Sequence, residues 1–220
     1  MAKRGLNLVI VARRDNLLSD FTNEIQNKYG VEAIALAIDL SSPEAVDEIF
    51  NGIKDLDIGI AIYNAALSPI GNFSEVDPAV TRETITTNRT TPTLFSQRFL
   101  KRQNERGMDG LIVVSSLSGY VGSPRVATYA ATKAYLHVLS EGLWGEVKDK
   151  NISILTITLG AISTPGLISR AQKKTPGQLD PAKVVDQSLS HLERGPTYTP
   201  GLNNKIGLTV LNKILPRSFQ

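Results

Sequence analysis

Short apolar runs alternate along the chain with segments in which apolar residues recur every three or four positions. The runs predict buried strands, and the recurring pattern predicts amphipathic helices. Strands are expected at residues 6–12, 31–40, 58–62, 111–114, 152–159 and 197–199. Helices are expected at residues 15–30, 42–53, 79–105, 129–148, 181–192 and 205–215. This alternation predicts an α/β fold, with a parallel sheet covered by helices on both faces.

Local signals set several helix limits. Asp15 is expected to be the N-cap of the first helix, and Gly30 is expected to end it. Ser42 and Pro43 predict the start of the second helix, with the hydroxyl as cap and proline at the first helical position.

In parallel sheets the ligand site lies at the carboxyl ends of the strands. Polar residues at those ends are therefore the candidates for function.

Composition excludes several kinds of site. With 220 residues, 41% of them apolar, the chain can build one core, so a single domain over residues 1–220 is expected. The absence of cysteine excludes disulfides and thiolate sites, and two distant histidines give no support for a metal cluster. A net charge of +3 without a long basic run gives no support for nucleic-acid binding. No apolar run approaches the roughly 18 residues of a membrane span, so a cytoplasmic protein is expected.

Tyr129 and Lys133 are four residues apart on a predicted helix and therefore share one face. A phenol is a poor acid or base at neutral pH unless a nearby cation stabilises its phenolate. Lys133 would supply that cation, and Tyr129 could then exchange a proton with a carbonyl or an alcohol. The spacing alone is weak, because a tyrosine at a helix start is more often a packing residue.

Two further polar residues accompany this pair. Ser116 ends a predicted strand, where its hydroxyl could donate to a substrate carbonyl or merely cap the strand. Asn88 lies in the middle of a predicted helix, where asparagine is unfavourable. It is either a functional amide that kinks the helix or holds a water, or part of a solvated helix face.

Together these residues resemble the short-chain dehydrogenase/reductase family, classical type, from about residue 5 to residue 200. The segment from Tyr129 to Lys133 resembles the family's active-site segment, and Asn64-Ala65-Ala66 resembles its Asn-Ala-Gly strand end. The resemblance implies a doubly wound, Rossmann-like parallel sheet and a nicotinamide-dependent carbonyl/alcohol oxidoreductase acting on a small molecule. It implies Tyr129 as acid/base, Lys133 as its pKa modulator and ribose ligand, Ser116 as the substrate orienter and Asn88 as a support of proton relay.

The cofactor is expected to be NADP(H) rather than NAD. Arg13 follows a strand at the position where dinucleotide folds distinguish the two, and an arginine there suits a 2′-phosphate. Asp39 and Leu40 resemble the family's adenine-binding pair, and Asn64 and Ala65 its cofactor-contacting strand end. The stretch from Leu159 to Thr164 resembles the segment that clasps the nicotinamide, which implies contacts from Ile162 and Thr164, although Leu159 replaces the usual proline.

The family's first strand and its glycine-rich phosphate-binding loop have no counterpart in this sequence. The chain opens at what resembles the end of the helix after that loop. A sheet without this strand would leave two central edges unpaired or closed on each other. We therefore expect a shortened form of a full-length reductase.

The same sequence features leave three alternative interpretations open and also indicate an oligomer. A catalytically silent, binding or regulatory protein of this fold, or an inactive truncated form, competes with the enzyme. The helix at residues 205–215 is amphipathic and could dock on a membrane surface, although core or subunit packing explains it better. The resemblance implies a homodimer or homotetramer paired through the helices at residues 79–105 and 129–148.

Overall fold

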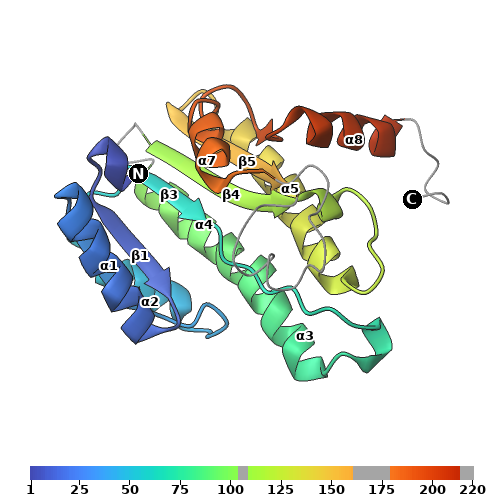
Figure 1. Ribbon diagram of the computed structural model, residues 1–220, viewed down its shortest axis with the longest axis horizontal. Helices are drawn as coiled ribbons and strands as arrows, with labels where there is room; N and C mark the ends of the chain where they lie inside the picture. The colour runs from blue at the N-terminus through green and yellow to red at the C-terminus, as the bar shows by residue number, and fades with distance from the viewer. Residues whose placement is uncertain (104–108, 161–178, 214–220) are drawn as a thin grey trace. The chain divides into compact units, whose positions relative to one another are not determined.

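The computed structural model describes residues 1–103, 109–160 and 179–213 (Figure 1). The chain divides into two compact units, Met1–Ile58 and Gly59–Gln220, and each is described below by itself. The prediction of one domain over residues 1–220 stays a prediction.

The first unit is a two-stranded parallel sheet with its connecting helix. Its elements are η1 (Ala2–Arg4), β1 (Leu8–Ala12), α1 (Asp15–Tyr29), β2 (Ala33–Ala37) and α2 (Ala45–Gly52). The register sets Ile10 opposite Ala35. Ile25 of α1 packs with Ala2 and Ala33, so the predicted apolar face of this helix covers the pair of strands.

The helix limits of the first unit match the prediction in part. Gly30 ends α1 in the left-handed conformation with a φ of 65°, as predicted. The N-cap of α1 is Arg14 rather than Asp15, which is the first helical residue. Helix α2 begins at Ala45, later than predicted, because the Ser42 hydroxyl is engaged before the helix. It donates to Glu44 Oε2 at 2.6 Å and accepts from the Glu44 N–H at 3.2 Å, which closes a local turn.

The second unit contains a four-stranded parallel sheet in the order β3-β4-β5-β6. The strands are β3 (Ile60–Tyr63), β4 (Asp109–Ser116), β5 (Ile152–Leu159) and β6 (Thr197–Tyr198). The main helices are α3 (Pro78–Ile85), α4 (Thr91–Gln103), α5 (Ala127–Val147), α7 (Pro181–Leu189) and α8 (Leu202–Lys213). Their limits differ from the predicted ones by a few residues, as helix ends commonly do.

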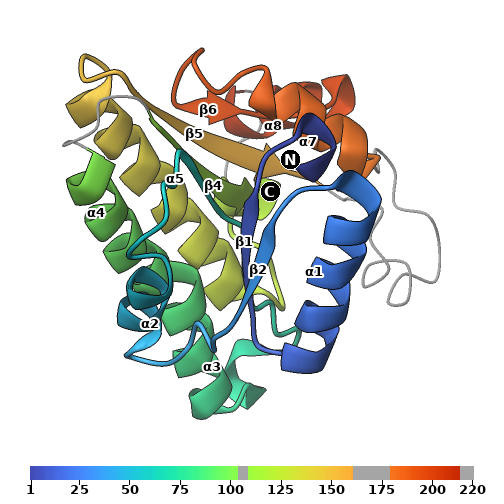
Figure 2. The same ribbon diagram turned by 90° about the vertical axis from the view of Figure 1, so that its left-hand side faces the viewer.

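Helices cover both faces of this sheet, as predicted for a doubly wound, Rossmann-like fold (Figure 2). On one face Leu189 of α7 packs against a cluster that includes Ile112 and Leu155. Successive strand residues point to opposite faces, so Leu111 and Ile154 belong to the other face, and α5 contacts both β4 and β5. Leu111 and Ile154 are fully buried, which places the centre of the core in these two strands.

The two sheets are separate within the described residues. Strand β1 pairs with β2 in the first unit, and β3 pairs with β4 in the second. No helix in the described part of the chain is long and apolar enough to cross a membrane.

The helix predicted at residues 79–105 is interrupted. Between α3 and α4 lies a π-helical segment, η3 (Thr86–Thr90), in which the Thr91 N–H bonds to the Thr86 carbonyl five residues earlier. Tyr63 of β3 explains part of this change, because its hydroxyl donates to the Thr87 carbonyl at 2.7 Å. The single long helix is thus a correction: two α-helices flank a segment shaped by tertiary hydrogen bonds.

Replacing Leu111 with alanine should lower the free energy of unfolding by about 2–5 kcal/mol, because the smaller side chain leaves a cavity in the buried centre of β4. Urea unfolding followed by circular dichroism measures this loss. Leu202→Ala is the matched control, because Leu202 is 72% exposed, and its effect should stay below about 0.5 kcal/mol. Equal losses in the two variants would contradict the assigned core.

Candidate active site

The candidate residues of the second unit meet at one edge of its sheet. Ser116 is the last residue of β4 and lies opposite Leu159, the last residue of β5. Tyr63 ends β3 opposite Val113, and Asn64 follows directly. Because the strands are parallel, these carboxyl ends form a single edge, which is the expected place for a ligand.

Ser116 begins a short 3-10 turn, η4 (Leu117–Gly119). Its Oγ accepts a hydrogen bond from the Ser118 N–H at 3.2 Å, so Ser116 caps the turn that follows its strand. A hydroxyl has one hydrogen and two acceptor lone pairs. The cap uses a lone pair and leaves the hydrogen to donate, so capping and substrate orientation are compatible.

Lys133 is buried beside Tyr129 on α5. Its side chain is almost fully enclosed, and Nζ lies 5.7 Å from the centre of the Tyr129 ring. Nζ donates to the Val114 carbonyl of β4 at 2.7 Å. Loss of water around the ammonium lowers the pKa of Lys133 to about 8. Two of its three hydrogens remain for other acceptors.

The Tyr129 phenol is subject to two opposing influences. Burial raises its pKa above the ordinary value, and a hydrogen bond with the Ser116 side chain acts in the opposite direction. Burial is the larger cause, so the phenol of the chain by itself is held in the protonated form. The role of Lys133 in lowering this pKa stays a prediction.

Asn88 lies in η3 and is completely buried. Its Oδ1 accepts from the Leu67 N–H, and its Nδ2 donates to the Leu67 carbonyl, both at 2.8 Å. Nδ2 also lies 3.2 Å from Thr132 Oγ1 on α5. The interpretation of Asn88 as part of a solvated helix face is therefore wrong. The amide ties the segment after β3 to the helix that carries Tyr129.

Two positioning contacts were not expected from the sequence. The Thr132 hydroxyl donates to the Tyr129 carbonyl at 2.7 Å, while accepting from Asn88. The Ser115 hydroxyl, also buried, donates to the Lys133 carbonyl at 2.9 Å. Both residues sit next to predicted site residues in the sequence, but nothing in the pattern shows which hydroxyl faces inward.

The predicted cofactor residues fall into three groups. Asn64 is exposed and Ala65 half-buried, directly after β3. In the first unit, Asp39 accepts from the Ser41 N–H at 2.9 Å and from its hydroxyl at 2.8 Å, and Leu40 follows. The pKa of Asp39 is lowered, first by the Ser41 N–H and also by the charge of Arg13, so Arg13 lies near this carboxylate.

Ile162 and Thr164 make up the third group and lie outside the described residues. The structure therefore brings together Ser116, Tyr129 and Lys133 with the supporting Asn88, and separately Arg13 with Asp39.

The donor set at this edge fits a nicotinamide nucleotide and a carbonyl. Lys133 keeps two hydrogens for ribose hydroxyls, and the exposed Asn64 lies at the adjacent strand end. Ser116 and Tyr129 supply hydroxyl donors for one substrate oxygen. The arrangement can therefore pass a proton to or from an oxygen while a hydride moves at the carbon.

Known proteins are similar to this chain in sequence and in fold. A 7beta-hydroxysteroid dehydrogenase from Clostridium sardiniense is 29% identical over 208 residues, which cover 93% of this chain and 80% of that protein. The solved structure of a 7beta-hydroxysteroid dehydrogenase studied for its stereoselectivity matches 99% of this chain and 86% of its own, with a TM-score of 0.93 and 26% identity. A short-chain dehydrogenase from Sphingobium yanoikuyae, solved in complex with NADPH, has a TM-score of 0.83 and 25% identity over 97% of this chain and 89% of its own.

The sequence model of the family described as short chain dehydrogenase matches residues 1–175. This match covers β1 through β5 and every described site residue. The chain therefore belongs to the short-chain dehydrogenase/reductase family, the NAD(P)-dependent oxidoreductases that interconvert carbonyls and alcohols.

Proposed function

We propose that this chain interconverts a bulky apolar alcohol and its carbonyl with NADP(H), using Tyr129 as the acid and base. The observation that carries the proposal is the buried Lys133 ammonium beside Tyr129 on α5, with Ser116 at the carboxyl end of the strand that α5 contacts. A buried cation, a phenol and a hydroxyl at the ends of parallel strands form the donor set that hydride transfer to a carbonyl requires.

The roles follow from the hydrogen bonds. Ser116 and Tyr129 donate to the carbonyl oxygen, which fixes the substrate and supports the charge that develops there. The nicotinamide, when bound, supplies the hydride. Tyr129 gives its proton to the oxygen during reduction and takes it back during oxidation. The Lys133 ammonium lies close enough to favour the phenolate that Tyr129 leaves behind.

NADP(H) is proposed over NAD because of Arg13. The residue follows β1, and its charge lowers the pKa of Asp39, so a cation is present in this part of the first unit. A guanidinium suits a 2′-phosphate, whereas a carboxylate at this position would suit a ribose diol. The similar Sphingobium yanoikuyae dehydrogenase was solved with NADPH, which supports the same choice.

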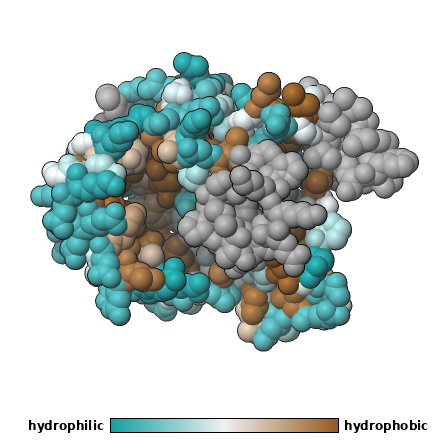
Figure 3. Space-filling view, viewed as in Figure 1, coloured by the Kyte–Doolittle hydropathy of each residue, from teal (hydrophilic) through white to brown (hydrophobic). Residues whose placement is uncertain are grey.

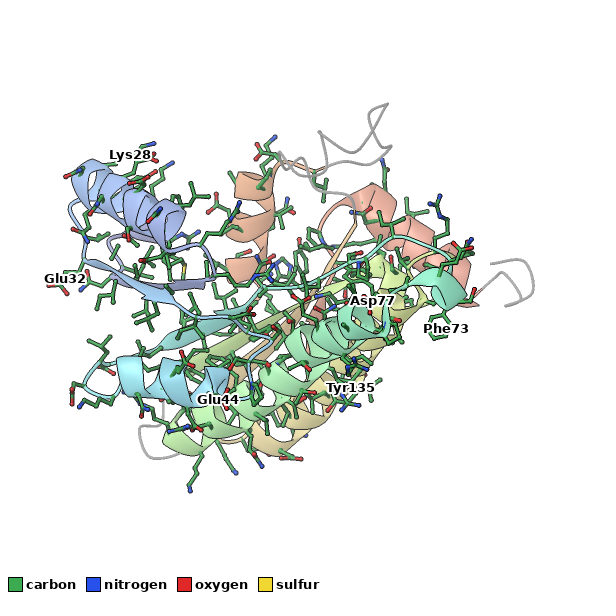
Figure 4. The ribbon with its side chains drawn as sticks, turned by 90° about the horizontal axis from the view of Figure 1, so that it is seen from below. Lys28, Glu32, Glu44, Phe73, Asp77 and Tyr135 are labelled. Atoms are coloured by element: carbon green, nitrogen blue, oxygen red, sulfur yellow. The ribbon has the colours of Figure 1, made fainter. Side chains whose placement is uncertain are left out.

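An apolar substrate is proposed from the surface of the segment that follows β3. Ile70 and Phe73 are 59% and 69% exposed. Figure 3 shows hydrophobic surface over this part of the second unit, and Figure 4 shows Phe73 near Asp77, where η2 (Phe73–Glu75) meets α3. The 7beta-hydroxysteroid dehydrogenases among the similar proteins support a steroid-sized ligand.

A cytoplasmic homodimer or homotetramer is also proposed. Leu94 of α4 is 46% exposed and Val138 of α5 is 70% exposed. These apolar side chains lie on the two helices expected to pair subunits. Their burial between two copies of the chain would stabilise the assembly.

Replacing Tyr129 with phenylalanine should lower kcat for reduction of a 7-oxosteroid by about a hundredfold or more, because the proton donor is lost. NADPH consumption measures the rate. Tyr135→Phe is the matched control, because it removes a half-exposed hydroxyl of the same helix that pairs with Thr93. Retention of full activity by Tyr129→Phe would contradict the mechanism. Absence of NADPH binding by the unaltered chain would favour the catalytically silent alternative.

Arg13→Ala should weaken NADPH binding about tenfold and leave NADH binding nearly unchanged, since only NADPH carries the 2′-phosphate. Isothermal titration with each cofactor measures the two affinities. Arg14→Ala removes the neighbouring exposed arginine and serves as the control, with both affinities unchanged. Equal loss for NADH and NADPH in Arg13→Ala would contradict the assignment.

The Lys133 ammonium should make stability depend on alkaline pH. Its pKa is about 8 in the folded chain and 10.5 ordinarily, so the cost of burying the charge is present below pH 8 and absent above 10.5. The free energy of unfolding should rise over this window by up to about 3 kcal/mol. Denaturant unfolding at a series of pH values tests this. Lys133→Met should lack the rise, and parallel curves for the two proteins would contradict a buried ammonium.

A further inference from the structure

The turn that carries Ser116 is in backbone contact with α5. A Cβ atom on Gly119 would lie 2.8 Å from the Ala134 nitrogen and 2.8 Å from the Lys133 carbonyl carbon. Real side chains do not approach backbone this closely, so only glycine allows the contact. The end of η4 therefore lies directly on the helix at Lys133.

Tyr120, the next residue, makes a second attachment one turn further along α5. Its hydroxyl is hydrogen-bonded to His137 Nε2. The two rings meet edge to face, with centres 4.5 Å apart and an angle of 72° between them. His137 lies four residues after Lys133, so the two attachments of the turn are adjacent on the helix.

The surroundings of His137 make this hydrogen bond its main polar contact. The His137 side chain is 13% exposed, and Glu141 Oε1 lies 3.8 Å from Nε2. Nδ1 is buried, with no hydrogen-bond partner in the part of the chain that the structure describes. Burial lowers the pKa of the ring, although Glu141 opposes this, so the neutral form pairs with Tyr120. A partly satisfied buried imidazole is costly, and a leucine would pack here without that cost.

We propose that Tyr120 and His137 are positioning residues of the proposed oxidoreductase reaction. Together they hold η4 on α5 and thereby fix the Ser116 hydroxyl relative to Tyr129. The inference rests on the proposed function, because Ser116 must orient a substrate for its position to matter. A small misplacement of such a group can cost up to about a hundredfold in rate.

The contact itself is tested without any assay of activity. The chain contains two histidines, so the ring nitrogens of His137 and His191 can be resolved by long-range proton–nitrogen NMR. Tyr120→Phe should shift the His137 nitrogen signals and leave those of His191 unchanged. His191 is a suitable internal reference because it pairs with the Gln187 carbonyl and stacks on Tyr198. Unchanged His137 signals would overturn the proposal.

The positioning role is tested by kinetics on the full chain with NADPH and a 7-oxosteroid. Tyr120→Phe should lower kcat about tenfold and change the dissociation constant of NADPH less than twofold. His137→Leu should show the same loss, whereas His137→Gln, which can still pair with Tyr120, should recover most of the rate. Tyr135→Phe is the matched control, because Tyr135 lies on the same helix (Figure 4).

The outcomes separate the positioning role from the proposed function. Unchanged kcat in Tyr120→Phe, or equal rates for His137→Leu and His137→Gln, would overturn the role alone. An unaltered chain that neither binds NADPH nor reduces the steroid would overturn the proposed function, and the positioning role with it. In that case the NMR measurement still reports whether Tyr120 and His137 are in contact.

Discussion

The burial of one ammonium group against one backbone carbonyl constrains the rest of the second unit. Lys133 reaches Val114 only if α5 lies close to the end of β4. The Ser115 hydroxyl on the Lys133 carbonyl and the glycine contact at residue 119 bring the two backbones together at the same place. A charge removed from water is costly unless it is well paired. The proposed chemistry, rather than stability, therefore accounts for a lysine at this place.

A second set of polar contacts holds the other half of the site. Asn88 joins Leu67, which follows β3, to Thr132, which bonds to the carbonyl of Tyr129. Tyr129, the proposed acid/base residue, is thus held through its backbone by one asparagine and one threonine. Fully satisfied buried networks of this kind specify a single arrangement, because each alternative leaves a polar group unpaired.

The sequence predicted the elements well where pattern and chemistry agree. The strand at residues 152–159 and the left-handed end of α1 at Gly30 follow directly from local signals. The family, the alternation of strands and helices, and the grouping of Ser116 with Tyr129 and Lys133 could also be predicted. The later start of α2 and the π-helical segment could not. Both depend on where side chains bond: Ser42 with its neighbour Glu44, and Tyr63 with a distant carbonyl.

The π-helical segment also sets the phase between α3 and α4. An α-helix turns about 100° per residue, so the extra residue in the widened turn rotates all of α4 relative to α3. A single deletion within Thr86–Thr90 would restore a continuous α-helix and turn the side chains of α4 away from their present neighbours on other elements. Phe99 of α4, which is almost completely buried, would leave the core. The packing of α4 therefore fixes the length of this stretch.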